Sequence, residues 1–96
     1  MDLSTLRTQY RSAILALAEK YRAENVRVFG SVARGDTKET SDIDFLVHMK
    51  KGASLLDEAG LEHELGELLK TRIDLLGDDA IRDEFLPFIM KEAVPL

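Results

Sequence analysis

The sequence predicts an α/β (α+β) domain in which helices pack on a small sheet of three strands. Three observations support this prediction. Short β-branched segments alternate with segments of helical periodicity, the chain has 96 residues, and 45% of these residues are hydrophobic. Domains typically run to about 100–150 residues, so we expect residues 1–96 to form a single domain with one core.

The N-terminal segment predicts a helix, because apolar side chains from Leu3 to Tyr21 recur at helical spacing. The polar pair at 24–25 marks the expected end of this helix. Residues 26–29 are mainly β-branched or aromatic and are stopped by Gly30, so they predict the first strand.

A polar segment separates the first strand from the second. Residues 31–41 contain many turn-forming residues and predict a loop with about one helical turn. Residues 43–49 predict the second strand, with Ile43, Phe45 and Val47 on one face.

A second helix and a third strand follow. Ser54 and Asp57 have the spacing of a capping box, in which each residue satisfies the other's backbone amide. The apolar face of this helix is supplied by Leu61, Leu65, Leu68 and Leu69. Residues 72–76 predict the third strand, which Gly77 closes.

The C-terminal segment predicts a last helix that Asp78 or Asp79 can cap. Pro87 has no amide proton, so we expect it to break this helix into two short pieces. We expect Phe85 and Ile89 to pack in the core.

The composition excludes several classes of function. Without cysteine the chain has no disulfide, no thiol nucleophile and no thiolate zinc site. A net charge of −5 argues against stable binding of nucleic acid, which needs a basic surface. No stretch approaches the roughly 20 apolar residues of a membrane span, and the charged N-terminus does not resemble a signal peptide. We therefore expect a cytoplasmic protein that binds no membrane.

Three acidic residues fall in or beside predicted strands, where Asp is disfavoured. Asp42 and Asp44 open the second strand, and Asp74 lies in the third between two apolar residues. Residues two apart share a face, so the first two carboxylates are roughly 6–7 Å apart and repel by about 2–3 kcal/mol. If the third strand is adjacent, all three converge, and bound Mg²⁺ would reverse this repulsion. The alternative is that Asp42 and Asp44 lie on a solvated face, apart from Asp74.

Gly30 and Ser31 follow the first strand and are suited to phosphate. Glycine permits a positive φ and a close approach of phosphate, and Ser31 offers a hydroxyl and an amide. Arg34 can add a guanidinium to the same triphosphate. The alternative is an ordinary turn at the end of a strand.

Gly30-Ser31, ten intervening residues and Asp42-Ile43-Asp44 together resemble the signature of the DNA polymerase β-like nucleotidyltransferase superfamily. Within it, the chain is similar to the minimal nucleotidyltransferases, the MntA-type antitoxins. The motif spans residues 29–47, including Ser41, and Asp74 matches the family's third carboxylate on a later strand.

This resemblance implies a mixed sheet flanked by helices, with ATP as substrate and two Mg²⁺ ions as cofactors. It implies that Asp42, Asp44 and Asp74 are catalytic and hold the metals, with Asp74 also a general base. Gly30 and Ser31 would hold the β- and γ-phosphates, assisted by Arg34. The implied reaction transfers AMP to a tyrosine of a HEPN-type all-helical ribonuclease toxin and releases pyrophosphate.

Two other functions stay open. The chain could neutralise a toxin by occupying its surface, with chemistry incidental, or could adenylylate a small molecule such as an antibiotic. The shortness of the chain argues against the second, because relatives that modify antibiotics carry a further domain for the acceptor. His48 ends the second strand on the face of the aspartates, where we expect a partly exposed histidine rather than a nucleotide contact.

Overall fold

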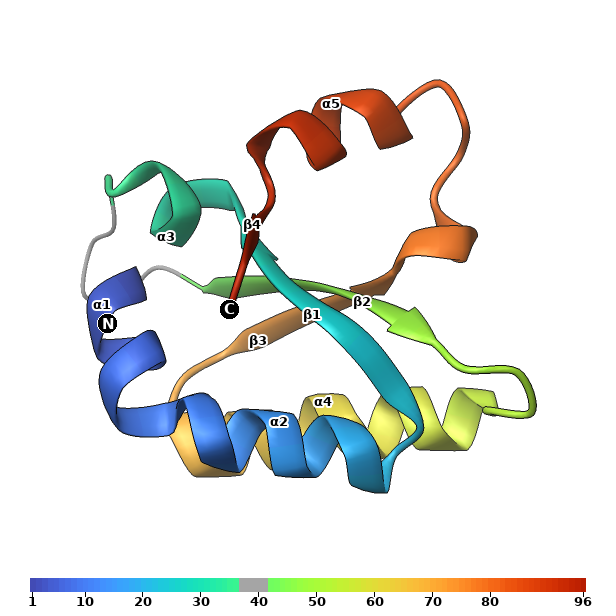
Figure 1. Cartoon of the computed structure of the whole chain (residues 1–96), viewed down its shortest axis with the longest axis horizontal. Coiled ribbons are helices and arrows are strands. Elements are labelled where there is room, and N and C mark those ends of the chain that lie inside the picture. The colour runs from blue at the N-terminus through green and yellow to red at the C-terminus, as the bar shows by residue number, and fades with distance from the viewer. Residues whose placement is uncertain (37–41) are drawn as a thin grey trace.

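A computed structural model describes residues 1–36 and 42–96 of the chain (Figure 1). The predicted loop at 31–41 and Ser41 of the motif fall partly or wholly at 37–41, outside the described residues. In chain order the elements are α1 (Leu3–Thr5), a π-helical segment (Leu6–Tyr10), α2 (Arg11–Lys20), β1 (Ala23–Phe29), α3 (Gly30–Arg34), β2 (Ile43–Met49), α4 (Leu55–Leu69), β3 (Ile73–Gly77), a 3₁₀ turn (Asp78–Ala80), α5 (Leu86–Glu92) and β4 (Val94–Pro95).

The sheet has the strand order β3-β2-β1-β4. β1 is antiparallel to both β2 and β4, whereas β2 is parallel to β3. The α/β class and the mixed sheet are confirmed, but the expected three strands become four. The additional strand was not predicted, because it has only two residues, too few to show a periodicity, and one of them is Pro95.

The first helix ends earlier than predicted, at Lys20, and β1 begins at Ala23 rather than at residue 26. Arg22 and Asn25 have positive φ angles of 61° and 50°. The register of β1 against β2 also shifts between Glu24 and Arg27. The chain therefore turns sharply at Arg22, and β1 begins irregularly. The sequence did not predict this start, because the polar residues at 24–25 lie within the strand rather than at the end of the helix.

The capping box of α4 is present as predicted. The backbone amide of Asp57 donates to Ser54 Oγ at 3.3 Å, and the Ser54 amide donates to Asp57 Oδ2 at 2.9 Å. Two orphan amides at the helix start are satisfied in this way.

The C-terminal segment does form two short pieces, but Pro87 does not separate them. The 3₁₀ turn at Asp78–Ala80 follows β3 directly, and α5 begins only at Leu86. Pro87 lies in the first turn of α5, where a missing amide proton costs no helical hydrogen bond. The prediction that Phe85 packs in the core is wrong, because this side chain is 54% exposed.

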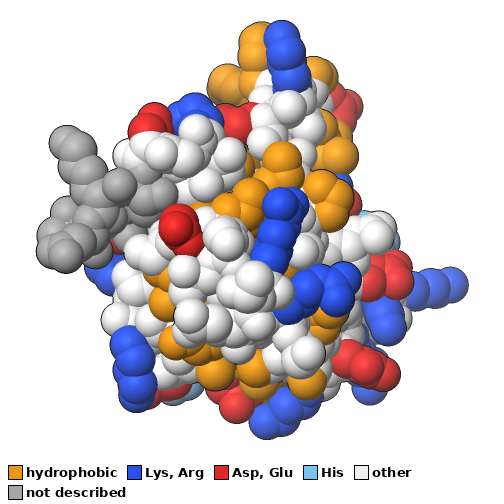
Figure 2. Space-filling view, turned by 60° about the vertical axis from the view of Figure 1, so that its left-hand side comes forward, with side chains coloured by type: hydrophobic (Ala, Val, Ile, Leu, Met, Phe, Trp, Pro, Cys, Tyr) orange, Lys and Arg blue, Asp and Glu red, His pale blue; other side chains and the backbone are white. Residues whose placement is uncertain are grey.

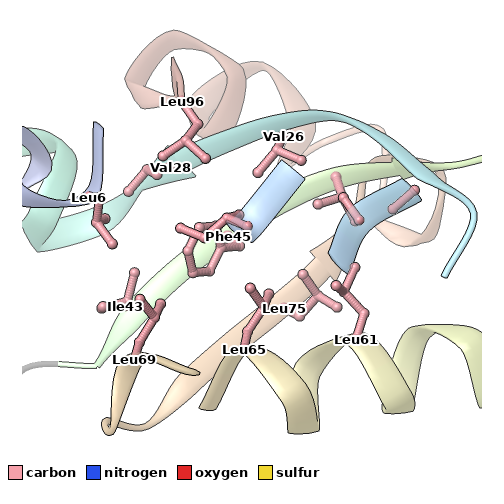
Figure 3. Close-up of a cluster of buried hydrophobic side chains, with 14 of the residues drawn as sticks. Leu6, Val26, Val28, Ile43, Phe45, Leu61, Leu65, Leu69, Leu75 and Leu96 are labelled. Atoms are coloured by element: carbon pink, nitrogen blue, oxygen red, sulfur yellow. The ribbon is translucent and has the colours of Figure 1, made fainter. Parts of the chain in front are cut away.

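A single cluster of buried side chains extends from Leu6 to Leu96 (Figure 3). α2 and α4 lie side by side against one face of the sheet and supply its helical half (Figure 1). The strands contribute Val26, Val28, Ile43, Phe45, Val47 and Leu75. Because side chains alternate along a strand, the intervening positions of β2 and β3 point to the opposite face.

No helix among the described residues is long and apolar enough to cross a membrane.

Candidate active site

The parallel pairing of β2 with β3 places two of the three aspartates side by side. Asp44 is the register partner of Asp74, and the next pair along is Phe45 with Leu75. Phe45 and Leu75 are buried against the helices, so Asp44 and Asp74 point to the opposite face. Asp42 precedes Asp44 by two residues and shares that face. The structure thus supports the adjacent-strand alternative for the acids.

Gly30 places the turn after β1 directly against Asp44. Phe29, the last residue of β1, is the register partner of Asp44. Gly30 has a φ of +72°, and a Cβ atom added to it would lie 2.1 Å from Asp44 Oδ2. Only glycine therefore lets the carboxylate lie against this turn, and Ser31 follows in the first turn of α3.

Burial and neighbouring charge both act on Asp44. Partial burial is the largest cause, and the charges of Asp74 and Asp42 add to it, so the pKa of Asp44 lies above its usual value of 3.8. Glu92 raises this pKa further, and Arg34 opposes the rise. The fold therefore holds three mutually repelling carboxylates on one face of the sheet at this place.

Arg34 lies between two acids rather than free at the surface. Its Nε atom is 3.2 Å from Asp36 Oδ2, and its Nη1 atom forms an ion pair with Glu92 Oε1. Glu92, at the C-terminal end of α5, was not predicted from the sequence. No local pattern marks it, because the end of α5 reaches the site only through the tertiary fold.

The three aspartates fit Mg²⁺ in the chemistry of their oxygen donors and in the face they share. Within residues 1–36 and 42–96, however, no three His, Cys, Asp or Glu side chains converge closely enough to form a ligand set. Asp74 is exposed, and Asp42 is 46% exposed, with its Oδ1 atom 3.9 Å from Arg72 Nε. Asp42 and Asp74 thus have surface side chains, which change rotamer within nanoseconds.

A second polar cluster occupies the same face at the other end of β2. His48 Nδ1 is 2.9 Å from Asp78 Oδ1, and Asp78 Oδ2 accepts a hydrogen bond from Arg27 Nη2 at 2.9 Å. Partial burial opposes ionisation of Asp78, but these two partners outweigh it and hold the Asp78 pKa below its usual value. The hydrogen bond to Asp78 raises the pKa of His48. The His48 side chain is 41% exposed, as expected, and lies one residue before the end of β2 at Met49.

On the helix-covered side, α2 and α4 enclose an open groove. Its lining combines alanine and leucine side chains, including Leu17 and Leu68, with polar and charged ones, among them the Lys20–Glu64 ion pair. This groove lies across the sheet from the aspartates and carries no part of their chemistry.

Comparison with known proteins places the chain among nucleotidyltransferases. Residues 11–96 match the family described as "Nucleotidyltransferase domain". A "putative protein adenylyltransferase" of Methanocaldococcus jannaschii is 38% identical over 86 residues, which are 90% of this chain and 92% of that protein. The "protein adenylyltransferase MntA" of Thermococcus cleftensis is 36% identical over 78 residues, which are 81% of this chain and 79% of that protein.

Solved structures show the same fold. A structure described as "putative minimal nucleotidyltransferase" has a TM-score of 0.88 at 44% identity and covers 100% of this chain and 97% of that chain. A crystal structure described as "the toxin-antitoxin with AMP-PNP" has a TM-score of 0.77 at 18% identity and covers 90% of this chain and 71% of that chain. At that identity the second likeness establishes the fold alone.

The contact between Gly30 and Asp44 predicts that alanine destabilises the fold more at Gly30 than at Gly35. Gly35 also has a positive φ, of +80°, but a Cβ there meets nothing within 4 Å. We expect Gly35→Ala to lower the free energy of unfolding by about 1–2 kcal/mol, the cost of a left-handed backbone. Gly30→Ala should cost about 1–3 kcal/mol more, because its Cβ displaces the carboxylate. Urea denaturation measures both.

The same two variants in an Asp44→Ala background provide the control. Without the carboxylate, most of the additional cost of Gly30→Ala should disappear. Equal costs for the two glycines in the wild-type background would contradict the contact.

The His48–Asp78 contact predicts a pH-dependent contribution to stability. Because the folded-state pKa of His48 is raised above 6.5, this contribution is fully present below pH 6.5 and is lost as pH rises through the folded pKa. NMR titration should place the pKa of His48 above 6.5, and Asp78→Asn should return it toward 6.5. The stability difference between wild type and this variant should narrow at high pH. The ring signals of His63, on α4, serve as the internal control.

A difference in stability that stays constant or widens between pH 6 and pH 9 would contradict this account.

Proposed function

Since the chain belongs to the nucleotidyltransferase domain family, we propose that it transfers AMP from ATP to a hydroxyl group of a partner protein. The acceptor we propose is a tyrosine of a HEPN-type ribonuclease toxin, which the modification silences, so that the chain acts as an antitoxin. The relatives named protein adenylyltransferase support the reaction class. The solved toxin–antitoxin structure with AMP-PNP supports a toxin as partner and ATP as substrate.

The observation that carries this proposal is the shared face of Asp42, Asp44 and Asp74 next to the turn at Gly30. Three carboxylates concentrated beside a glycine turn are costly for a structural role, because partial burial and then the charges of Asp74 and Asp42 raise the pKa of Asp44. The same arrangement suits a site that binds a triphosphate together with divalent cations.

In this proposal Gly30 and Ser31 bind the β- and γ-phosphates. The positive φ of Gly30 turns the chain at the Asp44 carboxylate, which brings the following backbone next to the acids, and the Ser31 hydroxyl and amide donate hydrogen bonds to the phosphates. Arg34 supplies a guanidinium to the triphosphate after exchanging its present partners, Asp36 and Glu92.

The reaction forms a bond between the acceptor oxygen and the α-phosphorus and breaks the bond from that phosphorus to the oxygen of the β-phosphate. Pyrophosphate leaves, and Asp74 takes the proton of the acceptor hydroxyl. Asp74 suits this task because it is exposed on the open face, where an incoming hydroxyl can reach it.

Asp42, Asp44 and Asp74 would hold two Mg²⁺ ions. When bound, these ions supply charge stabilisation for the attacking and leaving oxygens of an in-line displacement. The protein's own contribution is to fix the carboxylates on one face of paired strands.

Label transfer from α-³²P-ATP to a purified HEPN ribonuclease of the same organism tests this function. We expect Asp42→Asn, Asp44→Asn and Asp74→Asn each to lower the rate at least about 100-fold, the usual scale for a lost catalytic group. Chelation of Mg²⁺ by EDTA should abolish transfer. Glu19→Gln, an exposed acid on α2, is the matched control and should transfer normally. Transfer at the wild-type rate by Asp42→Asn or Asp44→Asn would refute the assigned site.

A second candidate function is occlusion of the toxin without chemistry. The exposed aromatic side chains of Phe85 and Phe88 favour it, because they offer a binding surface that needs no nucleotide. The Asp42→Asn, Asp44→Asn double variant separates the two functions in cells expressing the toxin. Protection by this variant would establish occlusion, whereas loss of protection with intact binding would establish catalysis.

A further inference from the structure

α5 has no buried residue, although its Met90 and Glu92 side chains contact arginines of β1 and α3. Phe88 is 74% exposed and Phe85, three residues earlier, is 54% exposed. Residues three apart lie on the same side of a helix, so the two rings form one surface, which we call the α5 patch. Figure 2 shows hydrophobic side chains at the top of the molecule, where Figure 1 places α5. Both rings therefore keep apolar area in water that burial against another surface would stabilise.

The position of α5 connects this patch to the aspartates. α5 ends at Glu92, whose carboxylate pairs with Arg34 of α3, the helix that begins at Gly30. With a rise of about 1.5 Å per residue, Phe88 lies only about 6 Å along the helix axis from Glu92. At its other side α5 is tied to the sheet by a hydrogen bond from Arg27 Nη1 to Met90 Sδ, at 3.1 Å. A protein that covered the α5 patch would therefore reach the active site as well.

Charge around the α5 patch indicates what kind of protein fits it. The segment at 78–84 carries four acids and one arginine, and Asp79, Asp83 and Glu84 are exposed. Lys91, exposed in the last turn of α5, is a basic exception. On the other side of the patch lie the acids of the active site. A matching surface would therefore be apolar at its centre and lined by Lys or Arg, since complementary charge steers association and fixes register. An RNA-cleaving protein has such basic groups.

We propose that the α5 patch is the docking site for the acceptor protein, through an apolar surface of that protein bordered by Lys and Arg. This inference rests on the proposed function, because it assumes that the acceptor is a protein. Docking through Phe85 and Phe88 holds the acceptor hydroxyl near Asp74 while the nucleotide occupies the turn at Gly30.

The chain offers a matched control for this patch. Leu55 and Leu56 are each 83% exposed at the start of α4, a helix on the opposite side of the sheet from the aspartates. This second apolar pair is at least as accessible as the α5 patch but lies away from the site. Leu55 also lines a small pocket with Asp79 and Ala80, but neither leucine belongs to the α5 patch. Substitution there therefore removes exposed apolar surface and leaves both phenylalanines in place.

The test compares Phe85→Ala, Phe88→Ala with Leu55→Ala, Leu56→Ala, each a double variant. Calorimetric titration with the purified HEPN ribonuclease measures affinity, and transfer of AMP from labelled ATP measures kcat and KM. Two lost aromatic anchors should weaken affinity at least about tenfold and raise the KM for the acceptor by a similar factor. kcat at saturating acceptor and the affinity for ATP should be unchanged, and the leucine variant should match wild type. Asp83→Asn, Glu84→Gln should reduce the salt dependence of binding.

The results distinguish failure of the docking site from failure of the proposed AMP transfer. Normal affinity in the phenylalanine variant, an equal loss in the leucine variant, or no binding by wild type would overturn the docking site. The wild-type chain could instead form dimers that the phenylalanine variant does not form, while both bind the ribonuclease equally well. That result would assign the α5 patch to contact with a second copy of this chain and would also overturn the docking site. Binding through the α5 patch without any AMP transfer would uphold the docking site and refute the proposed function.

Discussion

The parallel pairing of β2 with β3 is the constraint on which the site depends. This pairing sets Asp44 beside Asp74 and, one residue later, Phe45 beside Leu75. Burial of the two apolar side chains against α2 and α4 fixes the register, because a slip of one residue would carry Asp44 into the core. The hydrophobic core thus holds the aspartates together on the face it leaves open, and core packing opposes their mutual repulsion.

Two further elements complete this open face from distant parts of the chain. The turn at Gly30 lies against the Asp44 carboxylate and exists only because that residue has no side chain. α5 contributes Glu92, which binds Arg34 beside the aspartates. Arg34 is paired with Asp36 and Glu92, so in the proposed function a nucleotide would compete with Glu92 for this guanidinium. The site is consequently coupled to the position of α5.

Much of this arrangement could be predicted, because the signals are local. Alternating apolar residues indicated β2, the Ser54–Asp57 spacing indicated the start of α4, and the motif joining Gly30 to Asp44 indicated the family. Pairing of the third strand with the second was one of two alternatives that the sequence left open, and the parallel register of Asp44 with Asp74 decides for it. The missed features depend on tertiary contacts. β4 exists only through its pairing with β1, and Glu92 reaches the site only because α5 folds back. Phe85 was placed in the core because an apolar side chain is equally typical of a core and of a docking surface.

The most direct test of the account is the pKa of the Asp44 carboxyl, followed by ¹³C NMR in wild type and in Asp74→Asn. The account requires a value above 3.8 in wild type and a decrease when Asp74 loses its charge, because that charge faces Asp44 across the paired strands. If the pKa of Asp44 has its usual value and does not change in Asp74→Asn, the two carboxylates are not neighbours. That result would contradict the proposed site.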